Sequence, residues 1–136
     1  MSTIKIIDKG EKFTHAQIDN FSHFEGKEFL KDATEATSCE ISLGTLPQGA
    51  AVPFFHNHKE NEENYIIISG SGKFQIDTEV FDISAGSVIR VATGCDRNLK
   101  CTSQEPMTYL CIQAKENSLG NYTMTDGTIT ERPSPL

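Results

Sequence analysis

Short runs of β-branched and aromatic residues recur along the middle of this chain, and each run is bounded by Gly, Pro, Asp or Ser. Such runs predict β-strands, because branched and aromatic side chains fit a pleated, half-buried surface. Eight segments have this pattern: 39–46, 51–58, 64–69, 72–77, 80–83, 87–92, 98–103 and 107–114. The pattern contains no long helical period, so it predicts an all-β fold.

Eight short strands would leave exposed sheet edges unless the sheets close on themselves or stack. Their even spacing favours a jelly-roll or double-stranded barrel, whose mouth can hold one small ligand. The chain has 136 residues, with no repeat and no Pro/Ser-rich linker. We therefore expect a single domain over residues 1–136, with a barrel core at about 39–114.

Two flanks lie outside this predicted core, residues 1–38 and 115–136. The first contains three phenylalanines, Phe21, Phe24 and Phe29, and we expect it to form an extra strand or a dimer contact. In the second, the sequence YTMT-DG-TIT predicts a short hairpin on an Asp-Gly turn at residues 126–127, since this dipeptide is typical of tight hairpin turns.

The segment 51–58 ends in two histidines that share one face. Side chains alternate along a strand, so His56 and His58 point the same way. Val52 and Phe54 belong to the same row, which is therefore apolar at one end and polar at the other. We expect this row to line a barrel interior with a polar mouth.

A carboxylate follows close behind the histidines. The same parity places Glu63 and Tyr65 on one face of the next segment, and Glu63 can meet the two imidazoles across neighbouring strands. Two imidazoles and one carboxylate suit a divalent transition metal such as Zn, Fe, Mn, Ni or Co, so His56, His58 and Glu63 are candidate metal ligands. The alternative is that the histidines form a polar rim and the glutamate is a turn charge. Tyr65 is a candidate ligand-binding hydroxyl, or else a core aromatic.

The charge balance excludes several classes of partner. The chain has 12 Lys and Arg against 19 Asp and Glu, for a net charge of -7, whereas nucleic acids and anionic membranes attract basic faces. The longest aliphatic run, 66–68, is far too short to span a bilayer, and the N-terminus is polar. We therefore expect a cytoplasmic protein with a small-molecule ligand. The four cysteines lack CxxC spacing, so we expect free thiols.

The wider spacing around the histidines resembles a known family. Gly49, His56, His58, Glu63 and Gly70 stand in the order, and nearly in the spacing, of the first cupin signature, although the first gap is one residue longer than usual. The resemblance covers roughly residues 39–114 and is closest to the small single-domain cupins, whose fold is a double-stranded β-helix. It implies no particular substrate, because this fold includes dioxygenases, isomerases, lyases, epimerases, sensors and storage proteins.

Residues 86–101 are similar to the second cupin signature in their frame, with glycines at both of its glycine positions. Three other positions depart from it: Ala92 replaces the usual proline, Arg97 the histidine and Cys101 the asparagine. The missing histidine is normally a metal ligand in the family. Arginine has no acceptor atom and a permanent positive charge, so Arg97 cannot coordinate a cation and repels one placed nearby.

Arg97 therefore leaves two interpretations open. In the first, His56, His58 and Glu63 hold a metal with open coordination positions, and Arg97 binds an anionic substrate. In the second, no metal binds, and Arg97 pairs with Glu63 inside the barrel. Three functions are compatible with these residues: a metal-dependent enzyme acting on a small polar or anionic metabolite, a metal-free ligand-binding or sensor protein anchored by Arg97, and a structural dimer scaffold.

The resemblance also implies a homodimer, because small cupins usually pair through sheet faces or exchanged N-terminal strands. Phe55 and Ile66 lie on the rows that face away from the predicted pocket. Apolar side chains on an outer face favour a covering partner.

Overall fold

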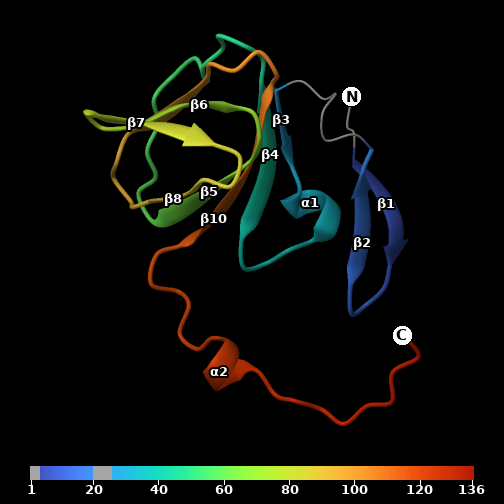
Figure 1. Cartoon of the computed structure of the whole chain (residues 1–136). Helices are drawn as coiled ribbons and strands as arrows, with labels where there is room; N and C mark the ends of the chain where they lie inside the picture. The colour runs from blue at the N-terminus through green and yellow to red at the C-terminus, as the bar shows by residue number, and fades with distance from the viewer. Residues whose placement is uncertain (1–3, 20–25) are drawn as a thin grey trace.

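Two antiparallel β-sheets face each other in the computed structural model, which describes residues 4–19 and 26–136 (Figure 1). The first sheet has the order β3 (Gly26–Phe29), β4 (Glu40–Leu46), β10 (Met107–Lys115), β5 (Asn61–Ser69) and β8 (Val88–Val91). The second has the order β7 (Glu79–Ser84), β6 (Ser71–Ile76) and β9 (Arg97–Cys101). The arrangement is a double-stranded β-helix, and it confirms the predicted all-β barrel.

Alternation along the strands decides which side chains fill the space between the sheets. In β5, Glu63, Tyr65 and Ile67 are buried, whereas Ile68 is 42% exposed. The same alternation buries every second residue of β9, beginning with Arg97. The core is completed by other apolar side chains from both sheets, including Leu43, Phe74, Ile83, Val91, Leu99 and Met107. Because each strand contributes alternate residues, a polar residue in register with this core is buried as well.

Seven of the eight predicted segments form strands, and the exception is 51–58. Within the described residues this segment makes only two isolated bridges, Ala51 with Lys100 and His56 with Arg97. Pro53 has no N–H to donate to a ladder. The side-chain amide of Asn98 instead donates to two backbone carbonyls in the segment, those of Val52 (2.8 Å) and Phe54 (3.3 Å). The prediction of a regular strand here is therefore wrong, although the segment still runs along β9.

The N-terminal flank supplies an extra strand, as predicted. β3 pairs with β4 at the edge of the five-stranded sheet. It is preceded by a hairpin of β1 (Ile4–Lys9) and β2 (Thr14–Ile18), and followed by one turn of helix, α1 (Lys31–Thr34). Phe29 is half exposed on β3, while Phe21 and Phe24 lie outside the described residues. A dimer contact through this flank stays a prediction.

The predicted C-terminal hairpin is wrong. Residues Thr123–Asp126 form one helical turn, α2, and the residues after it have no regular structure. The amide of Gly127 donates to the carbonyl of Thr123 (3.1 Å), and Gly127 has φ of -71°. A tight Asp-Gly hairpin turn needs positive φ at both central residues. The backbone therefore closes a helical turn instead of reversing direction.

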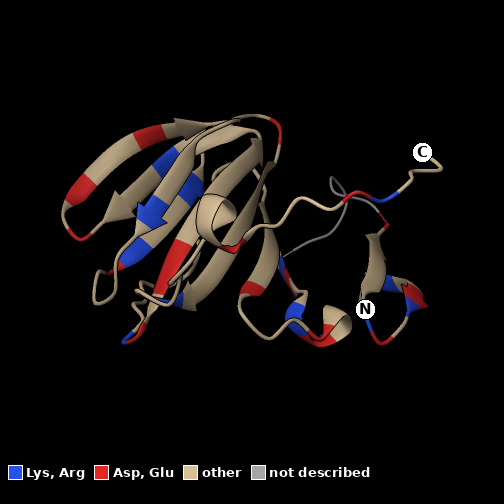
Figure 2. Ribbon diagram, turned by 90° about the horizontal axis from the view of Figure 1, so that it is seen from below, with Lys and Arg blue, Asp and Glu red and all other residues tan. Residues whose placement is uncertain are grey.

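Charged residues of both signs are interspersed over the strands, loops and hairpin (Figure 2). The described part of the chain has no helix long and apolar enough to cross a membrane. The absence of nucleic-acid and membrane partners stays a prediction.

Candidate metal centre

The HNH sequence is held against β9 and the turn before it. The amide of Arg97 donates to the His56 carbonyl (3.0 Å), and the amide of Gly94 donates to the His58 carbonyl (2.9 Å). Between the histidines, the Asn57 side chain donates to Asp96 on that turn (2.7 Å). This arrangement fixes the backbone so that both imidazoles point toward the barrel interior.

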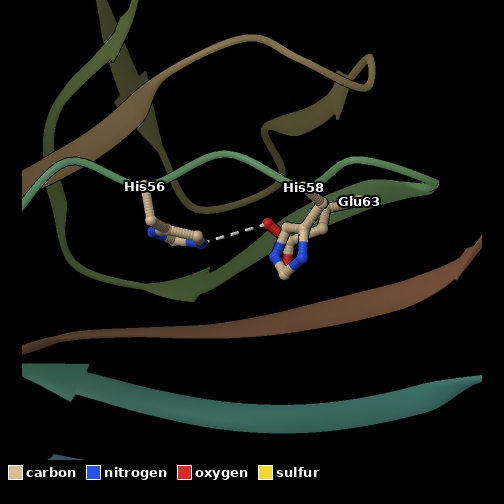
Figure 3. A group of neighbouring side chains, drawn as sticks. All are labelled: His56, His58 and Glu63. Carbon is tan, nitrogen blue, oxygen red and sulfur yellow. Dashed lines mark ion pairs between the residues drawn. The ribbon is translucent and has the colours of Figure 1, made fainter.

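His56, His58 and Glu63 converge, as Figure 3 shows. The Nε2 atom of His56 lies 3.6 Å from Oε1 of Glu63, and Nε2 of His58 lies 3.4 Å from Oε2. One ligating atom from each residue falls within 4.8 Å of the others. The three candidate ligands predicted from the sequence are therefore brought together.

These separations test whether a metal fits. They exceed ordinary hydrogen-bond distances, so the imidazoles of His56 and His58 do not simply donate to Glu63. Two ligands bound tetrahedrally at about 2.1 Å from one ion are about 3.4 Å apart, which is close to the observed values. The donor atoms and their spacing fit a divalent transition metal. His58 and His56 are also partly exposed, which leaves a route to the site.

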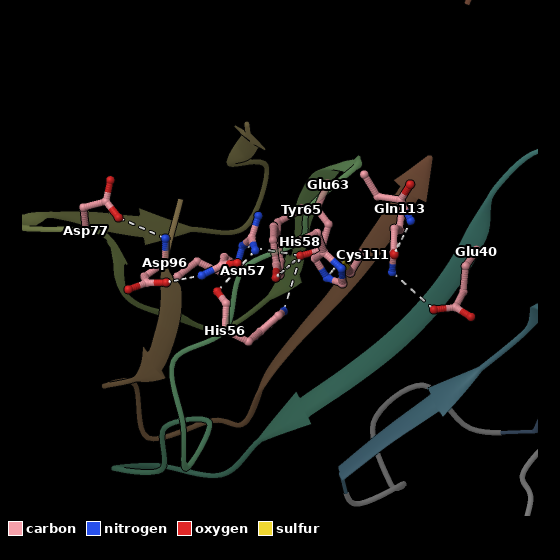
Figure 4. Close-up of polar contacts among 12 residues, drawn as sticks. Glu40, His56, Asn57, His58, Glu63, Tyr65, Asp77, Asp96, Cys111 and Gln113 are labelled. Carbon is pink, nitrogen blue, oxygen red and sulfur yellow. Dashed lines mark hydrogen bonds and ion pairs between the residues drawn. The ribbon is translucent and has the colours of Figure 1, made fainter. Parts of the chain in front are cut away.

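Two donors hold the Glu63 carboxylate from its inner side (Figure 4). The Tyr65 hydroxyl donates to Oε1 (3.0 Å), and the Cys111 thiol donates to Oε2 (3.1 Å). Each oxygen still has a lone pair for a cation, because a carboxylate oxygen accepts about two hydrogen bonds. Tyr65 therefore contacts the metal centre through Glu63, and whether it also contacts a ligand stays a prediction.

Burial and hydrogen bonding set the protonation of this group. Burial acts to raise the pKa of Glu63, but hydrogen bonds from Cys111 and Tyr65 and the nearby cationic groups outweigh it, so the pKa lies below its usual value. Burial, with the Glu63 charge, raises the pKa of Cys111 to about 12, and burial also raises the pKa of Tyr65 above its usual value. Both donors therefore keep their protons while Glu63 is ionised.

Cys111 was not singled out from the sequence. Its signal is its place on β10, where it lies directly across from Tyr65 on β5 and so shares the inward face. All four cysteines lie within the described residues and are free, as predicted. Cys101 is also buried, but its thiol donates to the backbone of Ser103 and Glu105 rather than to the metal centre.

Arg97 is fully buried beside the centre, where the sequence predicted it. Its Nε lies 3.5 Å from Oε1 of Glu63, and its Nη1 donates to the His56 carbonyl (3.2 Å). Its Nε and Nη2 have no hydrogen-bond partner among the residues that the structure describes. Burial is the main reason that the pKa of His56 lies below its usual value. The negative charge of Glu63 opposes this change, and the positive charge of Arg97 adds to it. A neutral imidazole is the form that binds metal.

A cavity of about 80 Å³ adjoins the centre. His56, Arg97 and Tyr65 form its polar side, together with two residues that sequence reasoning missed, Lys27 and Tyr109. Its other lining residues are Val52, Phe54, Asn98 and Leu99. Val52, Phe54 and His56 of the expected row all line this cavity, although Phe54 is 60% exposed and the segment is not a regular strand.

Known proteins share this architecture. The family described as Cupin domain matches residues 42–113. A cupin protein from Bacteroides fragilis is 36% identical, the match covers 96% of this chain and 100% of that one, and the TM-score is 0.76. A Thermotoga maritima protein named as a predicted oxalate decarboxylase is 21% identical over 69% of this chain and 96% of that one, with a TM-score of 0.57. At this identity the likeness shows the fold alone. No curated protein matches the sequence.

Proposed function

The chain belongs to the cupin family, and from that premise we propose that it binds a divalent transition metal through His56, His58 and Glu63 and acts on a small polar or anionic metabolite beside that metal. The observation that supports this most strongly is the spacing of the Glu63 oxygens from the two Nε2 atoms, 3.6 and 3.4 Å. Both separations are longer than ordinary hydrogen bonds and are close to those expected between two ligands of one ion, which supports the proposal.

The surrounding residues have distinct parts in this proposal. When bound, the metal supplies a Lewis acid that polarises an oxygen of the ligand. Tyr65 and Cys111 orient Glu63 and keep it ionised, as second-layer donors do in metal sites. The low pKa of His56 keeps its imidazole neutral and available at neutral pH. Arg97 provides a fixed positive charge for an anionic metabolite.

Metal uptake tests the proposal. Chelator-treated protein titrated with Zn²⁺ or Mn²⁺ in a calorimeter is expected to bind about one ion per chain. His58→Ala is expected to weaken that binding at least tenfold, because it removes one of three ligands. His15→Ala is the matched control, since His15 is exposed on β2 and lies outside the centre. Equal uptake by both variants would exclude this site.

A second function is supported by a specific observation. Arg97 already lies 3.5 Å from Glu63, and both side chains are buried, so the pair can balance the carboxylate without a metal. In that case the protein is a metal-free ligand-binding or sensor protein, with Arg97 as its anion anchor. Ligand binding that is unchanged by a chelator would favour this alternative.

A further inference from the structure

We propose that the cavity beside the metal centre is a carboxylate-binding subsite formed by Arg97, Tyr109 and Lys27, and that the ligand is a short-chain organic carboxylate. The inference deepens the proposed function, on which it rests, by naming the chemical class of the metabolite. Only Arg97 of these three was a candidate from the sequence.

Arg97 supplies the first observation. It has no exposed surface, yet Nε and Nη2 have no hydrogen-bond acceptor within the part of the chain that the structure describes. A buried donor without an acceptor is costly, and the cost is larger for a charged group. Glu63 lies near Nε but outside hydrogen-bonding geometry. An anion in the cavity that Arg97 lines would supply the missing acceptor atoms, and a planar carboxylate matches the guanidinium fork.

Strand register supplies the second observation. Lys27 on β3 pairs with Gly44 on β4, and Gly44 pairs with Tyr109 on β10, so the three form one cross-strand row. A Cβ atom at Gly44 would overlap Cζ and the hydroxyl of Tyr109. The glycine therefore leaves room for the Tyr109 ring to lie across β4 in the direction of Lys27.

Both side chains of this row reach the cavity. Lys27 and Tyr109 line it together with Arg97. Tyr109 is only 3% exposed, and burial raises the pKa of its hydroxyl to about 12, so it keeps the proton that it can donate to a ligand oxygen. Lys27 is exposed at the mouth, where its ammonium also lies 5.3 Å from the Phe29 ring centre.

Local charge favours an anion. Arg97 and Lys27 each contribute one positive charge, whereas Glu63 contributes one negative charge, so these groups are net positive even without a metal. The chain as a whole has a net charge of -7, which makes this pocket distinct from the average surface. A divalent ion at the centre would strengthen the preference.

Size limits the ligand. The cavity of about 80 Å³ is roughly half the 150 Å³ that holds benzene in an apolar protein cavity. Val52, Phe54 and Leu99 give it apolar walls, and Phe54 is 60% exposed. The space therefore suits a carboxylate with a few carbon atoms, with any longer part of the ligand passing Phe54 toward solvent.

The test compares propanoate with propanamide, its neutral analogue of similar shape, by chemical-shift titration of the full chain. Propanoate is expected to bind at least tenfold more tightly, with or without Zn²⁺. Lys27→Gln is expected to weaken propanoate binding about threefold, because an exposed ion pair contributes little to affinity, and the loss should shrink in high salt. Tyr109→Phe should weaken it about three- to tenfold through loss of one hydrogen bond.

Lys100→Gln is the matched control, since it removes the same charge from an exposed position on the opposite face of β9 from Arg97. It should leave propanoate binding unchanged. Equal binding of propanoate and propanamide, or equal effects of the Lys27 and Lys100 changes, would overturn the subsite. Tighter binding of inorganic phosphate than of propanoate would overturn the assignment to carboxylates.

These outcomes are separable from those of the metal titration. If Zn²⁺ does not bind but propanoate binding depends on Lys27 and Tyr109, the metal proposal fails and the subsite stands. If Zn²⁺ binds but propanoate binding is indifferent to both residues, the subsite fails and the metal proposal stands.

Discussion

At the scale of single residues, three candidate metal ligands lie beside a buried cation, the Arg97 guanidinium, which would repel a metal. Glu63 contacts both groups, because it faces two imidazoles on one side and Arg97 on another. Its two inner donors, Tyr65 and Cys111, keep it ionised in a buried position. The balance between a metal and Arg97 at this carboxylate is the main question about the site.

Replacing Arg97 with histidine addresses that balance. A unit charge several Å from a divalent ion costs roughly a few kcal/mol at an effective dielectric of about 20. Arg97→His is therefore expected to tighten Zn²⁺ binding at least tenfold in calorimetric titration. Arg90→His is the control, because Arg90 is exposed and pairs with Glu62 on the surface. An unchanged Zn²⁺ affinity in Arg97→His would mean that Arg97 does not oppose the metal.

Stability of the metal-free protein should fall in acid. The folded-state pKa of His56 lies below 6.5, so the unfolded chain takes up this proton first and stability is lost as pH falls below 6.5. The folded-state pKa of Glu63 lies below 4.5, so its stabilising contribution is present above 4.5 and is lost as pH falls through the folded-state value. Urea unfolding at several pH values measures this decline.

The control for that decline is the His56→Gln, Glu63→Gln double variant, in which neither position titrates. The fall in unfolding free energy between pH 7 and 4 should be smaller in this variant than in the original chain. An identical decline in both proteins would assign it to other groups.

At the scale of elements, strand parity carried most of the information about the site. Alternation alone placed Glu63 and Tyr65 inward on β5, and the signature frame placed Arg97 inward on β9. The segment containing the histidines was predicted as a strand, but Pro53 and the Asn98 side chain give it a different set of hydrogen bonds. His56 and His58 still share the inward face, because the segment follows β9.

Long-range register could not be predicted from the sequence. Cys111 reaches Glu63, and Lys27 reaches the cavity, only because β10 and β3 pair where they do. Periodicity tells which face a residue occupies within its own strand, but it does not tell which residues of distant strands become neighbours. The helical turn at the Asp-Gly pair was missed for a related reason, since one dipeptide permits several backbone conformations.

The contact between β4 and β10 at Gly44 gives a prediction at this scale. A methyl group there would overlap the Tyr109 ring, so Gly44→Ala is expected to lower the free energy of unfolding by about 1–3 kcal/mol, as overpacking does. Gly120→Ala is the control, because a Cβ atom at Gly120 would meet nothing within 4 Å. Urea unfolding compares the two variants. A loss no greater than that of the control would mean that the ring moves aside freely.

At the scale of the whole molecule, apolar side chains lie exposed on the outer face of the five-stranded sheet. Ile66 pairs with Val88 across β5 and β8, and Val88 is 67% exposed, with Ile68 nearby at 42%. The N-terminal hairpin exposes Ile7 and Phe13 as well. Both surfaces are consistent with the expected homodimer. The homodimer and the cytoplasmic location stay predictions.

Sedimentation tests the homodimer. At micromolar concentration the chain is expected to sediment as a species of twice its 15.0 kDa mass. Val88→Glu should shift it toward the monomer, because it places a charge on the apolar face. Val80→Glu, which changes another exposed valine, on the other sheet, is the control. A 15.0 kDa species alone would exclude the dimer.

The most direct test of the central claim is the metal content of untagged protein after purification without chelator. Elemental analysis is expected to find close to one transition-metal ion per chain in the original protein, and far less in a His56→Ala, His58→Ala double variant that remains folded. A folded original protein with no more metal than this double variant, and no uptake of added Zn²⁺ or Mn²⁺, would contradict the account and leave the Arg97–Glu63 pair as the basis of a metal-free binding protein.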